Sequence, residues 1–243
     1  MPESNSSAAN KSNPKIIIAL DFDALPPVFS LVEQLESNQC RLKVGKELFT
    51  KYGPKVVEEL QKRGFEIFLD LKFHDIPSTV AKAVKAAAQL GVWMVNIHCT
   101  GGLAMMEAAK NELLKSTDRV PLLIGVTVLT SMSQQQLNQV GVGGTINEQV
   151  VTLSKLAVEA GLDGVVCSAH ETTLLRKNTP TDFCLVTPGI RPSWAANDDQ
   201  HRIVTPGDAM AMGSNYLVIG RPITKADDPL AALHRIITEI ESL

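Results

Sequence analysis

The sequence predicts a single (β/α)8 (TIM) barrel of the α/β class, preceded by a short polar tail. Apolar, strand-like runs alternate eight times with amphipathic helical segments. These runs are almost continuously apolar, as parallel strands buried on both faces are. The length of 243 residues suits one such barrel. Alternating strands and helices indicate a parallel sheet, and eight repeats indicate that the sheet closes on itself.

The elements follow in a regular order after residue 14. We expect strands at residues 15–20, 41–44, 66–71, 93–97, 121–126, 164–167, 183–186 and 216–219. Apolar residues at helical spacing lie between them, as in Val56, Val57 and Leu60 or in Val80 and Val84. Three strands are preceded by a glycine that can end a helix, namely Gly64, Gly91 and Gly161. Residues 15–243 should therefore form the barrel, and residues 1–14 a disordered polar tail.

An open, doubly wound sheet is the alternative arrangement of the same elements. Such a sheet usually has a glycine-rich fingerprint after its first strand. Here the corresponding segment reads ALDFDALPP, which contains no glycine. The closed barrel is the preferred prediction.

Composition excludes several classes of function. A net charge of −3 argues against a surface for nucleic acid or for an acidic membrane. No run is long and apolar enough to span a bilayer, and the first fourteen residues lack the apolar stretch of a secretory signal. The four cysteines lie far apart, at Cys40, Cys99, Cys167 and Cys184. We expect free, buried thiols in a protein of the reducing cytoplasm.

Polar residues gather where the predicted strands end. They are Asp21, Lys43, Asp70, Lys72, Asn96, His98, Thr130, Ser131, Ser168, Arg191, Gly220 and Arg221. Two connections are also long, residues 129–145 after the fifth strand and residues 187–205 after the seventh. In a barrel the loops that follow the strands form the face that carries the active site. The polar residues should therefore converge on one rim.

The segment DLKFHDIPST contains the strongest chemical signal. Side chains of a strand alternate between its faces, so Asp70 and Lys72 should point the same way, with Leu71 opposite. Asp75 follows just past the strand end, and Lys43 lies one strand away. A solvated surface ion pair is the ordinary explanation of Asp-x-Lys, but charges inside a barrel are costly unless they are paired or used. Two ammonium and two carboxylate groups would keep one another ionised. Such a cluster suits a reaction that moves negative charge between atoms.

A second group of residues indicates phosphate binding. The loops after strands seven and eight, which form the usual phosphate site of this fold, contain Gly189 to Arg191 and then Gly220 and Arg221. Glycine allows close approach to backbone N–H groups, and arginine binds an anion through two N–H groups. Either arginine alone could be a solvated surface charge. Thr205 and Pro206 are typical of a helix start, which we expect near the same anion.

We predict no metal site. His98 could approach Asp70 and Asp21, but no two histidines have ligand spacing and the lysines would repel a cation.

At these motifs the chain resembles the orotidine 5′-phosphate decarboxylase family in its shorter bacterial form. The resemblance runs from about residue 15 to the last helix. It includes ALDF, RLKVGKELF, FLDLKFHDIPSTV, VLTSM, VTPGIRP and VIGRPIT. It implies cofactor-free conversion of orotidine 5′-phosphate to UMP and CO2, the last step of UMP synthesis.

The resemblance also implies roles for individual residues. Lys72 would donate the proton, within a catalytic tetrad completed by Lys43, Asp70 and Asp75. It implies a homodimer in which Asp75 and Thr79 complete the partner's pocket. The implied substrate contacts are Asp21 and Lys43 to the ribose, Thr130 to the pyrimidine, and Arg191, Gln200, Gly220 and Arg221 to the phosphate.

The sequence leaves two alternative functions open. A magnesium-dependent sugar-phosphate decarboxylase or aldolase of the same suprafamily shares the DxKxxD pattern and would be sensitive to a chelator. A non-catalytic phosphoribosyl-binding barrel would bind the nucleotide without turning it over.

Overall fold

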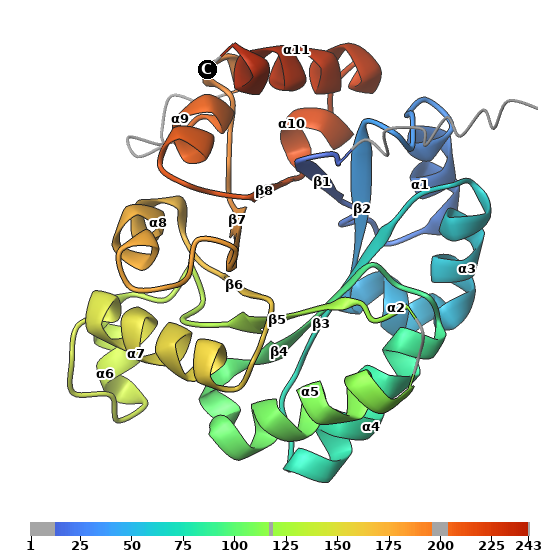
Figure 1. Ribbon diagram of the computed structural model, residues 1–243. Helices are drawn as coiled ribbons and strands as arrows, with labels where there is room; N and C mark the ends of the chain where they lie inside the picture. Colours follow the sequence, from blue (N-terminus) through green and yellow to red (C-terminus); the bar gives the residue numbers. More distant parts are fainter. Residues whose placement is uncertain (1–12, 117–118, 196–203, 243) are drawn as a thin grey trace, which may run out of the picture.

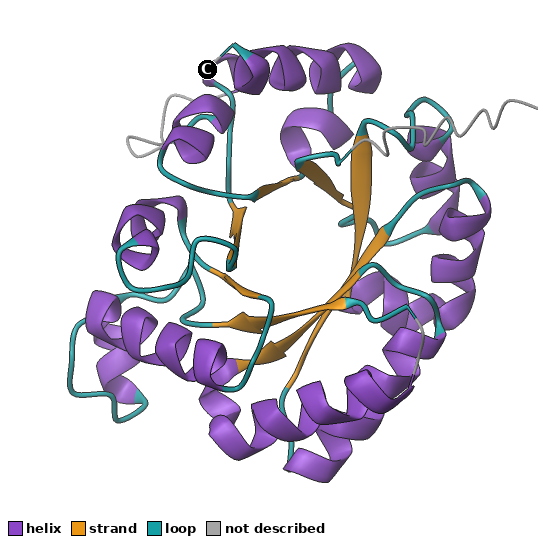
Figure 2. Ribbon diagram, viewed as in Figure 1, coloured by secondary structure: helices purple, strands orange, loops and turns teal. Residues whose placement is uncertain are grey.

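The computed structural model describes residues 13–116, 119–195 and 204–242, without the side chain of Ser116. Eight parallel strands form a closed barrel in sequence order, and the helices surround it (Figures 1 and 2). The barrel closes where β1 pairs with β8, with Ile16 opposite Leu217. The prediction of a (β/α)8 barrel is confirmed, and the open sheet is excluded. Residues 1–12 of the predicted tail lie outside the described ranges.

Each predicted strand is present, with ends that differ from the prediction by two residues at most. The strands are β1 (Ile16–Ala19), β2 (Cys40–Gly45), β3 (Ile67–Phe73), β4 (Met94–His98), β5 (Leu122–Val126), β6 (Gly164–Val166), β7 (Cys184–Pro188) and β8 (Tyr216–Ile219). The strands could be located from the sequence because each is a short and mostly apolar run, as is typical of parallel strands buried on both faces.

The helices begin and end at recognisable local signals. They are α1 (Leu25–Val32), α2 (Lys46–Tyr52), α3 (Pro54–Lys62), α4 (Pro77–Gln89), α5 (Leu103–Ser116), α6 (Gln134–Gln139), α7 (Ile146–Glu159), α8 (Ala169–Arg176), α9 (Pro206–Ala211), α10 (Arg221–Thr224) and α11 (Pro229–Glu241), with short 3-10 turns η1 (Cys99–Gly101) and η2 (Ser193–Ala195). Thr145 caps α7 and Glu148 completes its capping box. Gly161, just past the end of α7, has φ 71°, a conformation that residues with a Cβ avoid. Within the described residues, no helix is long and apolar enough to cross a membrane.

Apolar side chains form two cores, one on each side of the strands. Along β1, Ile16 and Ile18 pack outward against the helices, whereas Ile17 and Ala19 pack inside the barrel. The barrel interior becomes charged toward the carboxyl ends of the strands, because Lys43 on β2 lies at the same level as Ala19 on β1. The carboxyl-terminal end of the barrel interior is therefore charged, and the interior beneath it is apolar.

Aromatic and ionic contacts fill the amino-terminal end of the barrel. The Arg41 guanidinium lies 3.9 Å from the centroid of the Trp93 ring, which meets the Tyr216 ring edge to face at 5.1 Å. Arg41 also pairs with Glu66 at 2.8 Å. Trp93 therefore packs inside this end of the barrel, and the opposite rim is the open end.

The four cysteines are free, as predicted. Cys40, Cys99 and Cys167 are buried, and Cys184 is half-buried. Burial raises the pKa of the Cys40 and Cys99 thiols to about 12. These thiols are therefore poor nucleophiles.

Candidate active site

A cavity of about 380 Å³ opens at the carboxyl-terminal rim of the barrel. Residues at the ends of β1, β2, β3, β5, β6, β7 and β8 line it. The convergence predicted for the strand ends is confirmed for Asp21, Lys43, Asp70, Lys72, Thr130, Arg191, Gly220 and Arg221, all of which line this cavity.

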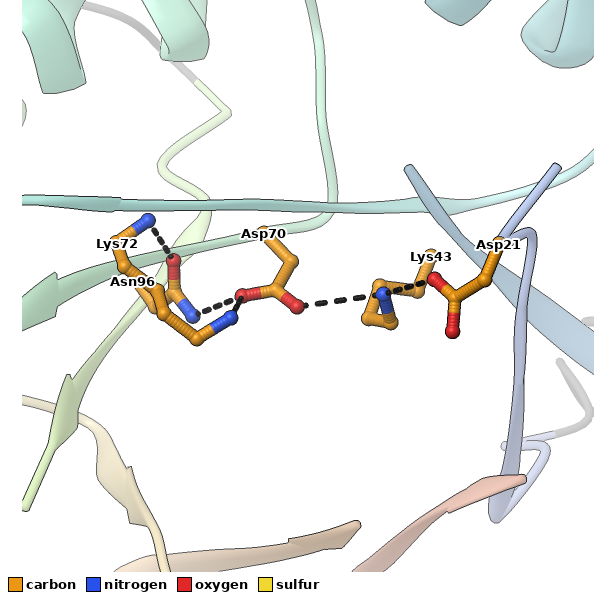
Figure 3. A network of polar contacts seen from close by, with 5 residues as sticks. All are labelled: Asp21, Lys43, Asp70, Lys72 and Asn96. Carbon is orange, nitrogen blue, oxygen red and sulfur yellow. Dashed lines mark hydrogen bonds and ion pairs between the residues drawn. The ribbon is translucent and has the colours of Figure 1, made fainter. Parts of the chain in front are cut away.

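Four charged groups alternate in sign along one wall of the cavity (Figure 3). Lys43 Nζ lies 3.1 Å from Asp21 Oδ1 and 3.3 Å from Asp70 Oδ2. Asp70 Oδ1 in turn accepts a hydrogen bond of 2.5 Å from Lys72 Nζ. Lys43 and Asp70 are buried, whereas the Asp21 side chain is 71% exposed and that of Lys72 26% exposed. The chain of charges thus runs from solvent into the barrel and back to the cavity surface.

Asp70 is held as a carboxylate at the centre of this network. Burial by itself raises the pKa of its carboxyl. The ammonium groups of Lys43 and Lys72, together with hydrogen bonds from Lys72 and Asn96, outweigh burial and keep the pKa below its ordinary value. The expectation that this carboxylate is ionised is consistent with these contacts.

The Lys72 side chain joins the network from a distorted stretch of backbone, which the alternation of side chains along a strand did not predict. Its φ is 53°, and it is the one non-glycine residue with positive φ among the residues that the structure describes. The register between β3 and β4 shifts between Leu69 and Phe73, so the strand is irregular at this point. Such a backbone costs roughly 1 kcal/mol or more and occurs mainly at functional sites. Lys72 meets Asp70 as expected, but through a distorted strand end.

Asn96 joins the network and was not predicted to do so. It is fully buried on β4, where its Nδ2 donates to Asp70 Oδ1 at 2.7 Å and its Oδ1 accepts from the Lys72 backbone N–H at 2.8 Å. The sequence puts Asn96 among the polar residues at the strand ends, but it predicts no role for this side chain. A polar amide within the apolar run MVNIH is the signal that could have identified it.

Asp75 and Thr79 do not reach this cavity within one chain. Both are exposed near the start of α4, and neither lines the cavity. Asp75 Oδ1 accepts from the backbone N–H of Ile76 at 2.6 Å. The expected cluster of two lysines with Asp70 and Asp75 therefore does not form in the isolated chain, where Asp21 occupies the fourth position in the alternation.

The part of the cavity formed by the loops after β7 and β8 is cationic. Gly189, Arg191, Gly220 and Arg221 line it, and Gly189 has φ 79°. Among the described residues, neither Arg191 nor Arg221 is paired with a carboxylate. These two guanidinium groups are available to an anion. Gln200, predicted to act with them, lies outside the described residues.

Thr205 begins a helix, as predicted. Its side chain accepts from the N–H of Asp208, and Pro206 follows in the first turn of α9. Neither residue is among those that line the cavity. The helix that starts at the cavity is the short α10, whose N-cap is Gly220.

His98 lies beside the network rather than in it. Its ring centroid is 5.4 Å from that of His74. Burial, with the positive charge of His74 and nearby lysines, lowers the pKa of His98 to about 4. The described residues contain no cluster of three or more histidine, cysteine or carboxylate side chains suited to a metal ion.

Fold and site together define the class of protein. A closed (β/α)8 barrel whose rim cavity is lined by alternating lysines and aspartates and by two arginines is an enzyme scaffold for a small phosphorylated substrate.

The chain belongs to the orotidine 5′-phosphate decarboxylase / HUMPS family, whose model matches residues 14–236. It is 58% identical to orotidine 5′-phosphate decarboxylase of Saccharophagus degradans, over 95% of this chain and 97% of that protein. It is 59% identical to the protein of the same name from Shewanella sediminis, over 93% of this chain and 96% of that protein. Among solved structures, the orotidine 5′-phosphate decarboxylase of Lactobacillus acidophilus superposes with a TM-score of 0.84 at 40% identity, covering 94% of this chain and 99% of that one.

Proposed function

We propose that this chain converts orotidine 5′-phosphate to UMP and CO2 without a metal or cofactor. The observation that carries the proposal is the contact network in which Asp70 lies between the ammonium groups of Lys43 and Lys72 at one end of the cavity. The family membership and the names of relatives at 58% and 59% identity agree with it.

Lys72 is the proposed proton donor. Loss of CO2 breaks the bond between C6 of the pyrimidine and the carboxylate carbon, and its electron pair stays on C6. The Lys72 ammonium lines the cavity and is partly exposed, so it can approach this carbon. It would stabilise the developing carbanion electrostatically and then transfer its proton to C6. The resulting lysine amine regains a proton from solvent before the next turnover.

Asp70 holds the Lys72 ammonium and faces the place proposed for the substrate carboxylate. Its own charge is secured by Lys43, which lies 3.3 Å away. Two carboxylates brought together in the ground state would repel each other, and departure of CO2 would relieve this repulsion. Lys43 and Asp21, which are linked at 3.1 Å, would bind the ribose hydroxyls.

The phosphate is assigned to the cationic end of the cavity. Arg191 and Arg221 would bind it through their guanidinium groups, and Gly189 and Gly220 would allow it to approach the backbone. Binding at this remote end can be used to orient the pyrimidine over Lys72, and it then contributes to the rate as well as to affinity. Thr130, which lines the cavity on the loop after β5, would contact the pyrimidine, and Gln200 is proposed to act on the phosphate.

We further propose a homodimer with shared active sites in the cytoplasm. Asp75 and Thr79 are exposed and do not line the cavity of their own chain, and Ile76 between them is 64% exposed. A second chain packed on this surface would bury Ile76 and receive Asp75 in its own cavity. The free cysteines suit a reducing compartment.

A spectrophotometric assay of orotidine 5′-phosphate loss, with and without a chelator, tests the proposed function. We expect full turnover in both conditions. No loss of orotidine 5′-phosphate, together with a chelator-sensitive activity on a sugar phosphate, would favour the magnesium-dependent enzymes of the same suprafamily. Tight binding of the nucleotide without turnover would instead establish a phosphoribosyl-binding barrel.

A further inference from the structure

Asn96 lies on β4 beneath the charged network, in contact with two of its members. The side chain is 0% exposed and does not line the cavity, so a bound substrate would not touch it. Its side-chain amide nevertheless makes two hydrogen bonds to the network. Nδ2 donates to Asp70 at 2.7 Å, and Oδ1 accepts from the Lys72 backbone N–H at 2.8 Å (Figure 3). An amide offers these two functions on separate atoms without adding charge.

The bond to Lys72 supports an unusual backbone. Because φ of Lys72 is 53° and the β3–β4 register is interrupted there, the Lys72 N–H is bonded to the Asn96 side chain rather than to a β4 carbonyl. A buried N–H without a partner is strongly disfavoured. Asn96 Oδ1 therefore substitutes for a sheet acceptor at the residue from which the proposed proton donor projects.

The bond to Asp70 orients its carboxylate. Oδ1 of Asp70 accepts both from Asn96 Nδ2 and from Lys72 Nζ, at 2.7 and 2.5 Å. With Oδ1 held between these two donors, Oδ2 is directed toward Lys43 Nζ, 3.3 Å away. Loss of the amide would leave the carboxylate free to rotate between two ammonium groups.

We propose that Asn96 is a positioning residue for the decarboxylation, which sets the backbone of Lys72 and the orientation of Asp70 so that the lysine ammonium meets C6. This inference rests on the proposed function. Misplacement of a reacting group by about 1 Å can cost about 100-fold in rate. Removal of Asn96 should therefore lower kcat far more than it weakens nucleotide binding, because the phosphate and ribose contacts come from other residues.

The experiment compares Asn96→Ala with Asn215→Ala. Asn215 is a matched control because its Oδ1 also accepts from a neighbouring backbone N–H, that of Leu185 at 2.7 Å, and from Arg176, but it precedes β8 and lies outside the cavity. We expect Asn96→Ala to lower kcat about 100-fold while the Kd for UMP changes less than about threefold. Asn215→Ala should lower thermal stability but keep kcat within about threefold of the wild type.

Asn96→Leu provides a second test if the alanine variant does not fold, because leucine has the same branched arrangement of heavy atoms as asparagine but can make neither hydrogen bond. The same kcat loss is expected. A folded Asn96 variant with near-normal kcat would overturn the positioning role. So would a loss that lies entirely in UMP binding, or an equal kcat loss in Asn215→Ala. A wild-type chain without turnover would overturn the proposed function itself, so the two failures are distinguishable.

Discussion

Replacing Asp70 with asparagine should destabilise the fold at neutral pH and make its stability less sensitive to acid. The carboxylate is buried and uses both oxygens, Oδ2 toward Lys43 and Oδ1 toward Lys72 and Asn96. An asparagine has one acceptor oxygen, so its NH2 group would face either an ammonium or the amide of Asn96. The Lys43 ammonium would keep only Asp21, whose side chain is 71% exposed and screened by solvent.

The size of the effect follows from these contacts. Removing one partner of a fully buried ion pair costs about 3–5 kcal/mol. Here Lys72 is 26% exposed and Lys43 retains one partner, so we expect about 2–3 kcal/mol at pH 7. For a chain of this size that corresponds to a fall in Tm of about 4–12 °C.

The pH dependence has a definite sign. The pKa of Asp70 is lowered in the folded protein, so its stabilising contribution is present above the unfolded pKa of about 4 and is lost as pH falls through the folded pKa. The stability difference between wild type and Asp70→Asn should therefore be constant from pH 7 to about pH 5 and shrink below about pH 4.

Thermal unfolding of both proteins between pH 7 and pH 3 checks this prediction. Glu112→Gln is the control, because Glu112 pairs with Lys85 at 2.8 Å at a partly exposed surface site, where removal should hardly change the Tm. An Asp70→Asn protein as stable as wild type at pH 7, or a difference that widens in acid, would refute the reasoning.

The remaining predictions concern activity. Lys72→Ala should lower kcat at least about 10⁴-fold while UMP binding, measured by calorimetry, is retained; near-normal turnover would contradict its role as donor. Mixing inactive Asp75→Asn and Lys72→Ala proteins should restore some activity through hybrid dimers with one intact site; no recovery after verified subunit exchange would count against a shared site. Arg191→Ala and Arg221→Ala should each lower kcat/KM about 10- to 100-fold with orotidine 5′-phosphate. Neither should affect turnover of orotidine, which lacks the phosphate, and an equal loss with both substrates would remove the phosphate assignment.

Much of the fold could be predicted because its signals are local. Each strand is a short apolar run, and helices end at residues such as Gly161, where φ is positive. Eight repeats of strand and helix leave few topologies, and closure of the barrel then brings Asp21, Lys43 and Arg221 to one rim although they are far apart in the chain.

What the sequence by itself determined is the set of charged groups at the strand ends, because strand periodicity decides which residues reach the rim. Only the tertiary structure decided which of them touch. The left-handed backbone of Lys72, the bridge made by Asn96, the exclusion of Asp75 from the network of its own chain and the absence of Thr205 from the cavity lining all depend on contacts between separate elements. Hydrogen bonds across strands depend on register and on differences of about 1 Å in atomic position, which no spacing along the chain encodes.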